Sequence, residues 1–216
     1  MDKTNVRLKL RLTIYWISFA LIILILPIVI ILNLKTYFFS RFEINSVYEE
    51  FSKYLIDEVT VKSKFVEVID YLHLQTNSLD VNFFSIEDRL HLKDVRVIII
   101  TLYSILLLSL AITLIRRKEI KDNIKTLTRI STYYLTILIP FLLLINHYYD
   151  YFFTLAHRIV FSNEYWLLDP RTSNLIKMFP QNIFYEIFQI VVISNILMHG
   201  IFIFIVISKH EKLSRK

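Results

Sequence analysis

Histidine is the residue type in this sequence that is best suited to acid–base chemistry, because its ring titrates near neutral pH. The chain holds six histidines and no cysteine, which excludes thiolate nucleophiles and cysteine-ligated metals. Its single glycine, Gly200, excludes a glycine-rich loop that would cradle a phosphate or a dinucleotide. The search for catalytic residues therefore begins with the histidines.

Two of these histidines, His91 and His157, each have an acidic residue at helical spacing. Asp94 follows His91 by three residues, and Asp150 precedes His157 by seven, so each pair would share one face of a helix. Such a carboxyl group can orient an imidazole and fix its tautomer. The residues alone leave three roles open: acid–base catalysis, a structural role, or a metal site that includes Asp169, although no H-E-x-x-H motif is present.

Four apolar segments are long enough to cross a bilayer, which takes about 20 helical residues. Apolar residues make up 55% of the 216 residues, more than a soluble domain of this size can bury. We interpret the first segment as a retained anchor, because it is too long for a signal-peptide core and no small-residue cleavage site follows. The sequence thus predicts an all-α membrane protein, a single membrane domain (1–216), with transmembrane helices at about 13–33, 95–115, 131–149 and 187–208.

The charges of the connecting segments predict the orientation of these helices. Segments 1–12, 116–130 and 209–216 hold 14 Lys or Arg and four acids, whereas loops 34–94 and 150–186 hold 15 acids and 10 basic residues. The positive-inside rule therefore predicts that the first three are cytoplasmic and that both loops are extracytoplasmic. The net charge of +6 is accounted for by this anchoring, so we expect no nucleic acid partner.

The first outer loop, 34–94, is longer than a usual connection and contains neither Gly nor Pro. Long ordered loops tend to be functional. Its apolar residues recur at partly helical spacing, and the β-branched segment 59–61 is predicted to divide the loop into two helical pieces. The residues at this spacing are Phe51, Leu55, Val59, Phe65, Ile69 and Leu72. We expect a mainly helical cap, with both histidines at the outer ends of spans.

Two blocks of sequence carry a further signal. The first is Phe84-Ser85 followed by Leu90–Arg96, immediately before the second span. The second contains Asp150, Phe153, His157, Phe161, Asn163, Tyr165, Trp166, Asp169, Pro170, Leu175, Ile176 and Pro180. Together with the four spans and the unequal outer loops, these blocks resemble the Lit family, the lipoprotein intramolecular transacylases, over nearly the whole chain.

The resemblance implies an O-to-N acyl transfer on bacterial lipoproteins. The sn-2 acyl chain of a diacylglyceryl-cysteine would move to the α-amine of the same cysteine and give a lyso-form lipoprotein, without a cofactor or a metal. His157 would act as the base and His91 as its partner in proton transfer or oxyanion stabilisation, or the reverse. Residues implied to orient the rings or shape the site are Asp94, Asp150, Arg96, Trp166, Asp169 and Tyr165.

We therefore expect a monomeric, multi-pass protein of the bacterial plasma membrane, with both termini in the cytoplasm and its active site at the outer leaflet. Its partners would be a diacylglyceryl-modified lipoprotein substrate and membrane lipid. Two alternatives stay open. One is a non-catalytic accessory or sensor protein with an outer cap, and the other is a different acyl-transfer or hydrolytic enzyme that uses the same histidines.

Overall fold

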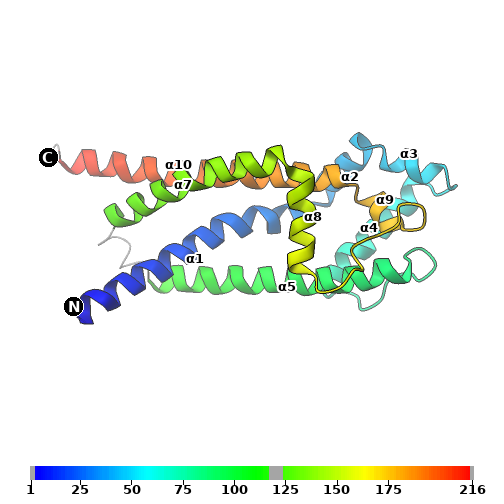
Figure 1. Cartoon of the computed structure of the whole chain (residues 1–216), viewed down its shortest axis with the longest axis horizontal. Helices are drawn as coiled ribbons and strands as arrows, with labels where there is room; N and C mark the ends of the chain where they lie inside the picture. The colour runs from blue at the N-terminus through cyan, green and yellow to red at the C-terminus, as the bar shows by residue number, and fades with distance from the viewer. Residues whose placement is uncertain (1–2, 117–123, 215–216) are drawn as a thin grey trace. The chain divides into compact units, whose positions relative to one another are not determined.

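The computed structural model describes residues 3–116 and 124–214, and within these residues it is helical and contains no strand (Figure 1). Short connections and turns join the helices. The helices are α1 (Lys3–Asn33), α2 (Lys35–Ile44), α3 (Val47–Ser52), α4 (Glu58–Leu72), α5 (Ile86–Ile115), α7 (Ile124–His147), α8 (Tyr149–Val160), α9 (Asn174–Met178) and α10 (Gln181–Ser214).

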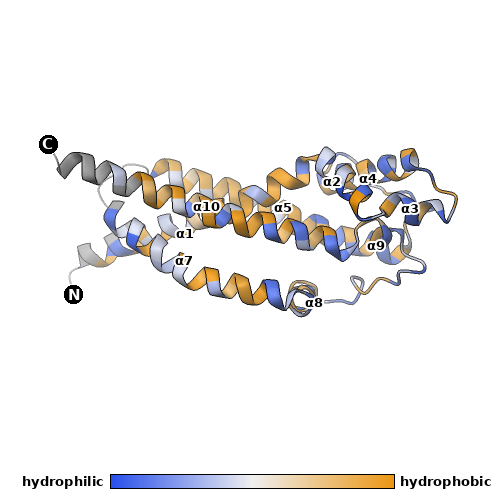
Figure 2. Cartoon of the chain, turned by 90° about the horizontal axis from the view of Figure 1, so that it is seen from above, coloured by the Kyte–Doolittle hydropathy of each residue, from blue (hydrophilic) through white to orange (hydrophobic). Residues whose placement is uncertain are grey.

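Four of the described helices are long and apolar enough to cross a membrane, which confirms the predicted number of spans. Figure 2 shows the apolar residues along them. The candidate spans are Lys9–Asn33, Ile86–Ile115, Thr128–His147 and Gln181–Ile205. The second and fourth begin nine and six residues earlier than expected from 95–115 and 187–208, because the polar residues there continue the same helices. Residues 1–2, 117–123 and 215–216 of the predicted cytoplasmic segments lie outside the described residues.

The chain forms two compact units that share helices. Unit 1 comprises Met1–Ile28, Ser104–His147 and Gln189–Lys216, and unit 2 comprises Val29–Tyr103 and Tyr148–Phe188. All eight residues predicted for the site belong to unit 2.

Unit 1 is held together by aromatic rings and one buried amide. Trp16 of α1 contacts Tyr134 of α7 at a centroid distance of 5.3 Å, and Tyr134 contacts His199 of α10 at 4.8 Å. Asn195 of α10 donates a hydrogen bond to the Ile23 carbonyl oxygen on α1 at 3.4 Å. With only one glycine in the chain, larger side chains take the place of the glycine contacts common between membrane helices.

The core of unit 2 is aromatic. Phe65 of α4 lies between Phe38 and Phe42 of α2, with centroid distances of 5.0 and 5.2 Å, and it contacts Phe179 at 5.9 Å. The rings of Phe38, Phe42 and Phe65 are fully buried. Burial of apolar surface and edge-to-face ring contacts both stabilise aromatic clusters of this kind. The cluster therefore fixes α4 against α2 and against the segment that precedes α10.

The expected division of the first outer loop is displaced by a few residues. Asp57 caps α4 by accepting a hydrogen bond from the Thr60 N–H at 2.8 Å, so the break lies at 53–57 and the segment 59–61 is helical. Leu55 and Val59, which belong to the helical spacing noted in the sequence, are 98% and 74% exposed, because Leu55 lies in the break and Val59 in the first turn of α4. The N-cap residue Asp57, and not the β-branched segment 59–61, therefore decides where α4 begins.

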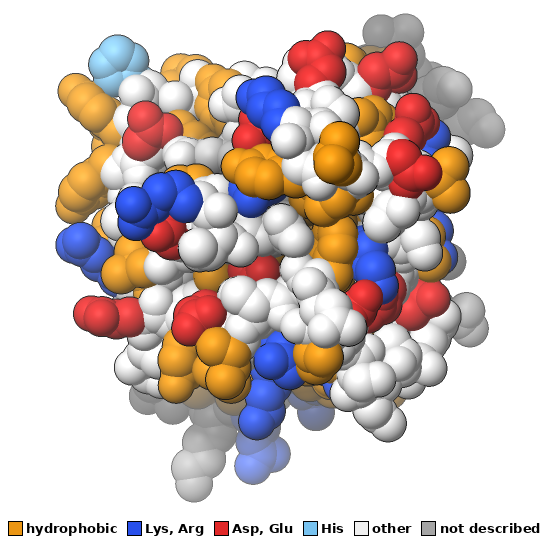
Figure 3. All heavy atoms as spheres, turned by 90° about the vertical axis from the view of Figure 1, so that its right-hand side faces the viewer, with side chains coloured by type: hydrophobic (Ala, Val, Ile, Leu, Met, Phe, Trp, Pro, Cys, Tyr) orange, Lys and Arg blue, Asp and Glu red, His pale blue; other side chains and the backbone are white. Residues whose placement is uncertain are grey.

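The end of unit 2 that carries α3 and α4 presents both signs of charge interspersed on its surface (Figure 3). Ion pairs within this unit include Lys53–Glu50, Lys62–Glu58 and Lys64 with both Glu67 and Asp80. The exposed pairs among these contribute little to stability individually. They show that this surface is suited to water rather than to lipid.

A buried carboxyl group joins the first turns of α5 and α9. Asp88 accepts a hydrogen bond from the Ser85 N–H at 3.1 Å, and the Ser85 hydroxyl accepts one from the Asp88 N–H, which together form a capping box. The other oxygen of Asp88 accepts a hydrogen bond from the Ser173 hydroxyl. Ser173 in turn caps α9 by accepting from the Ile176 N–H at 3.1 Å. Asp88 has no exposed surface.

Replacement of Asp88 by alanine is expected to destabilise the protein, because it leaves the buried Ser173 hydroxyl and the Ser85 N–H without their acceptor. A cost of about 1–3 kcal/mol for each unsatisfied group is typical. Thermal unfolding of the purified protein in detergent measures this loss of stability as a lower unfolding midpoint. The control is Glu87→Ala, which changes the adjacent exposed acid. Equal unfolding midpoints for the two variants would contradict the role assigned to Asp88.

Candidate active site

His157 lies near the end of α8, on the face of this amphipathic helix that points into unit 2. The residues of that face recur one helical turn apart, at Phe153, His157 and Phe161, whereas Tyr151 and Ile159 on the opposite side are 64% and 75% exposed. The ring nitrogen Nδ1 of His157 donates to the Phe153 carbonyl oxygen at 2.8 Å. Because this bond takes the proton of the neutral ring, Nε2 is left as the acceptor.

His91 lies in the second turn of α5, which the capping box of Asp88 starts. Its ring contacts Phe161 at a centroid distance of 5.0 Å in an edge-to-face arrangement. Nδ1 of His91 is buried and has no hydrogen-bond partner among the described residues. A buried polar atom without a partner is rare in proteins, and here it lies in the wall of a cavity.

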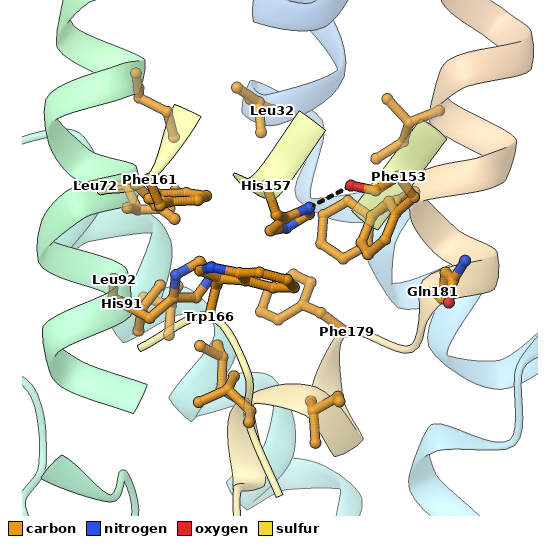
Figure 4. A pocket seen from close by; sticks show the side chains of 18 of the residues that line it. Leu32, Leu72, His91, Leu92, Phe153, His157, Phe161, Trp166, Phe179 and Gln181 are labelled. Atoms are coloured by element: carbon orange, nitrogen blue, oxygen red, sulfur yellow. Dashed lines mark hydrogen bonds between the residues drawn. The ribbon is translucent and has the colours of Figure 1, made fainter. Parts of the chain in front are cut away.

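The two imidazoles face each other in this cavity, with ring centroids 6.3 Å apart and ring planes 31° from parallel (Figure 4). The cavity has a volume of about 400 Å³ and is lined mainly by apolar side chains from α1, α2, α4, α5, α8, α9 and α10. Trp166 and Phe153 contact the His157 ring at 5.2 and 4.4 Å. The residues that line the cavity include no Asp, Glu, Lys or Arg.

The two carboxyl groups expected to orient the rings hydrogen-bond to other residues. Asp94 accepts from the Asn163 side chain at 2.8 Å, and Asp150 accepts from the Gln181 side chain at 2.8 Å. The orientation of His157 comes instead from a carbonyl oxygen of its own helix. Asp94 and Asp150 therefore support the site without contacting the imidazole rings. Asp94 holds the segment after α8 against α5, and Asp150 joins α8 to the start of α10.

Arg96 lies outside the cavity lining and clamps a loop of unit 2. Its guanidinium group donates to the Asn77 side-chain oxygen at 3.2 Å and to the Thr76 carbonyl oxygen at 3.4 Å. It also lies over the Tyr71 ring at 4.5 Å. These contacts hold the loop after α4 against α5.

Of Tyr165, Trp166 and Asp169, the predicted site residues between α8 and α9, only Trp166 lines the cavity. Tyr165 is 42% exposed, and its N–H donates to the Asn163 side chain at 3.1 Å. Asp169 forms a two-point ion pair with Arg171, and this hydrogen bonding lowers the pKa of Asp169 to about 2. Its carbonyl oxygen accepts from the Thr172 and Ser173 N–H groups, so Asp169 shapes the turn that leads to α9.

Four polar residues near the histidines were not singled out as site residues from the sequence: Thr154, Gln181, Asn163 and Asp88. Thr154 and Gln181 line the cavity, whereas Asn163 and Asp88 hold its walls through hydrogen bonds. The capping-box spacing of Ser85 and Asp88 is a local signal that could have been found in the sequence. No local signal identifies Gln181, because its partner Asp150 is 31 residues away.

A metal site has no support in the part of the chain that the structure describes, since no group of three or more potential ligands is found there. The cavity can instead hold an uncharged, largely apolar ligand against two imidazoles. Acid–base chemistry on an ester or an amine fits that environment.

The family described as lipoprotein intramolecular transacylase Lit matches residues 13–185. The chain belongs to the Lit family. It is therefore an acyltransferase and a multi-pass membrane protein. No curated protein matches the chain.

The fold is shared with the membrane integral lipoprotein intramolecular transacylase Lit from Bacillus cereus, with a TM-score of 0.78 and 20% identity over 96% of this chain and 99% of that one. Two structures of the B. cereus protein with one histidine mutated are also similar. The arginine variant has a TM-score of 0.74 and 19% identity over 97% of this chain and 96% of that one. The alanine variant has a TM-score of 0.71 and 18% identity over 96% and 97%.

The hydrogen bond between Asn163 and Asp94 generates a prediction about how the cavity wall is held. Asn163→Asp would place a second carboxyl group 2.8 Å from Asp94, and the repulsion should displace the segment that carries Trp166. We expect the transacylation rate to fall by at least tenfold. The measurement is the initial rate of product formation in detergent. Asn163→Ser, which retains a donor, is the control and should keep more activity; equal rates for the two variants would contradict this role.

Proposed function

We propose that this member of the Lit family transfers the sn-2 acyl chain of a diacylglyceryl-cysteine lipoprotein to the α-amine of the same cysteine. The observation that carries the proposal is the pair of imidazoles in an apolar cavity, with Nε2 of His157 free to accept a proton. His157 serves as the base, because the bond from its Nδ1 fixes the tautomer that such a base needs. His91 is its partner in proton transfer.

The reaction forms one bond and breaks one. The amine nitrogen attacks the ester carbonyl carbon, and a C–N bond forms while His157 accepts the N–H proton. His157 passes this proton to His91. The bond between the carbonyl carbon and the glycerol oxygen then breaks as that oxygen receives the proton from His91, and both histidines return to their neutral state. The products are an amide and a glycerol hydroxyl, so no co-reactant is needed.

The uncharged lining favours attack by a neutral amine. An ammonium group in the cavity would lack a carboxylate partner among the lining residues, and an unpaired buried charge is costly. The donor and the acceptor belong to one substrate, so confinement by the aromatic walls mainly has to bring amine and ester together. Positioning of this kind can lower a barrier by about 7–11 kcal/mol. Exclusion of water protects the ester from hydrolysis.

Removal of either imidazole is expected to abolish most of the activity. His157→Ala and His91→Ala should each lower the rate by about 10²–10⁴-fold, the usual contribution of a general acid or base. Mass spectrometry of the N-terminal lipopeptide measures the conversion of O-acyl to N-acyl product, and it also detects released fatty acid, which would indicate a hydrolase.

The control for this experiment is His147→Ala, which removes an exposed histidine outside the cavity lining. It should retain the rate of the natural sequence. Wild-type activity in both cavity variants, or an unchanged acyl count on glycerol with the natural sequence, would contradict the proposed function. Immunoblotting for equal protein levels separates loss of catalysis from loss of protein.

We further propose that both termini and segment 116–130 face the cytoplasm, and that the reaction takes place at the outer leaflet of the plasma membrane. The support is the excess of 14 Lys or Arg over four acids in the three segments concerned. This orientation gives the site access to lipoproteins that have been exported, with their acyl chains in the outer leaflet.

The absence of cysteine makes the orientation directly measurable. Single cysteines placed at Ser78, Thr126 and Ser214 should differ in their reaction with a membrane-impermeant maleimide. We expect labelling at position 78 in intact cells, and labelling at positions 126 and 214 only after permeabilisation. The reverse pattern would overturn the assigned orientation. The unmodified chain is the control, since it has no thiol to label.

A further inference from the structure

An arm of the cavity extends away from the histidines along α5. His91, Val95 and Ile99 follow one another at intervals of four residues and all line the cavity, so they lie on one face of the helix. The eight residues from His91 to Ile99 correspond to about 12 Å at 1.5 Å per residue. Leu32 of α1 and Ile187 of α10 complete this arm, and Figure 4 shows Leu32 beyond the His157 ring.

The arm is suited to a hydrocarbon chain and to little else. Four of the five residues of the arm are aliphatic, the exception being His91, and Ile99 is only 5% exposed. The three helices that form it belong to candidate membrane spans, so apolar surface continues along each of them. The rest of the cavity ends differently, because Phe38, Val68 and Leu72 close it within the core of unit 2.

We propose that this arm binds the acyl chain that is transferred, and that Ile99 determines how bulky or long that chain can be. The inference rests on the proposed function, since it requires the ester carbonyl to lie between His91 and His157. The first carbons of the sn-2 chain must then lie beside these rings, and an extended chain that leaves them follows the aliphatic face of α5. The sn-1 chain is attached to a different glycerol carbon and makes no such demand.

The depth of the arm limits what it can select. About 12 Å is less than half of the roughly 30 Å hydrocarbon core of a bilayer, so the arm encloses the carboxyl-proximal part of a long chain. A larger side chain at position 99 would obstruct long chains at the end of the arm. A short chain would end before it reaches the obstruction, and its transfer would continue.

The test compares Ile99→Phe with the natural sequence on synthetic lipopeptides whose two acyl chains differ. One carries palmitoyl at both positions, one carries hexanoyl only at sn-2, and one carries hexanoyl only at sn-1. We expect Ile99→Phe to lower kcat/KM at least tenfold for both substrates with sn-2 palmitoyl, and less than threefold for the substrate with sn-2 hexanoyl. The matched control is Val97→Phe on the same helix, where the side chain is 61% exposed and outside the cavity lining; it should not discriminate among the substrates.

Several results would overturn the inference while leaving the proposed function intact. Equal losses on all three substrates would mean that Ile99 has only a structural role, and unchanged rates on all three would mean that the chain lies elsewhere. If the loss of kcat/KM followed the length of the sn-1 chain instead, the arm would bind the sn-1 chain and not the chain that is transferred. Failure of the proposed function is distinct, because the natural sequence would then give no N-acyl product from any of the lipopeptides.

Discussion

The carboxyl group of Asp88 lies between the first turns of α5 and α9, and it accepts a hydrogen bond from each of them. Because it is fully buried, losing either donor would cost the desolvation of an unsatisfied group. These hydrogen bonds cap the start of α5, where Asp88 lies three residues before His91, and they fix the end of the loop that carries Trp166. Two walls of the cavity are thus held by one side chain that lies outside the cavity lining.

The same division between support and chemistry recurs around the histidines. The lining itself offers two imidazoles, a hydroxyl, an amide and an indole among apolar groups. The acids that were expected to touch the rings accept hydrogen bonds from side-chain amides instead: Asp150 from Gln181 of the lining, and Asp94 from Asn163 outside it. A charged group inside the cavity would attract water and stabilise an ammonium ion. Keeping the carboxyl groups one contact away leaves the cavity suited to a neutral amine and an ester.

The aromatic side chains confine the site and also build the fold. Phe38 lines the cavity and packs against Phe65 in the core of unit 2, and Phe179 contacts both of these rings. A rigid wall of this kind suits the proposed intramolecular reaction, because holding amine and ester together can lower its barrier by about 7–11 kcal/mol. The expected helical cap is therefore more than a cover: its core and the cavity share side chains.

The sequence by itself determined the four spans and the family, because long apolar runs, basic flanks and the motif around His157 are local features that need no knowledge of packing. It also indicated His91 and His157, because both lie close to the predicted outer ends of apolar segments. Tertiary structure alone decided what the acids do: the spacing of Asp94 and Asp150 allowed contact with the rings, but Asn163 and Gln181 reach them from other segments, 69 and 31 residues away. The exposure of Leu55 and Val59 was likewise decided by packing, since helical spacing identifies a face only when the helix begins where it is assumed to begin.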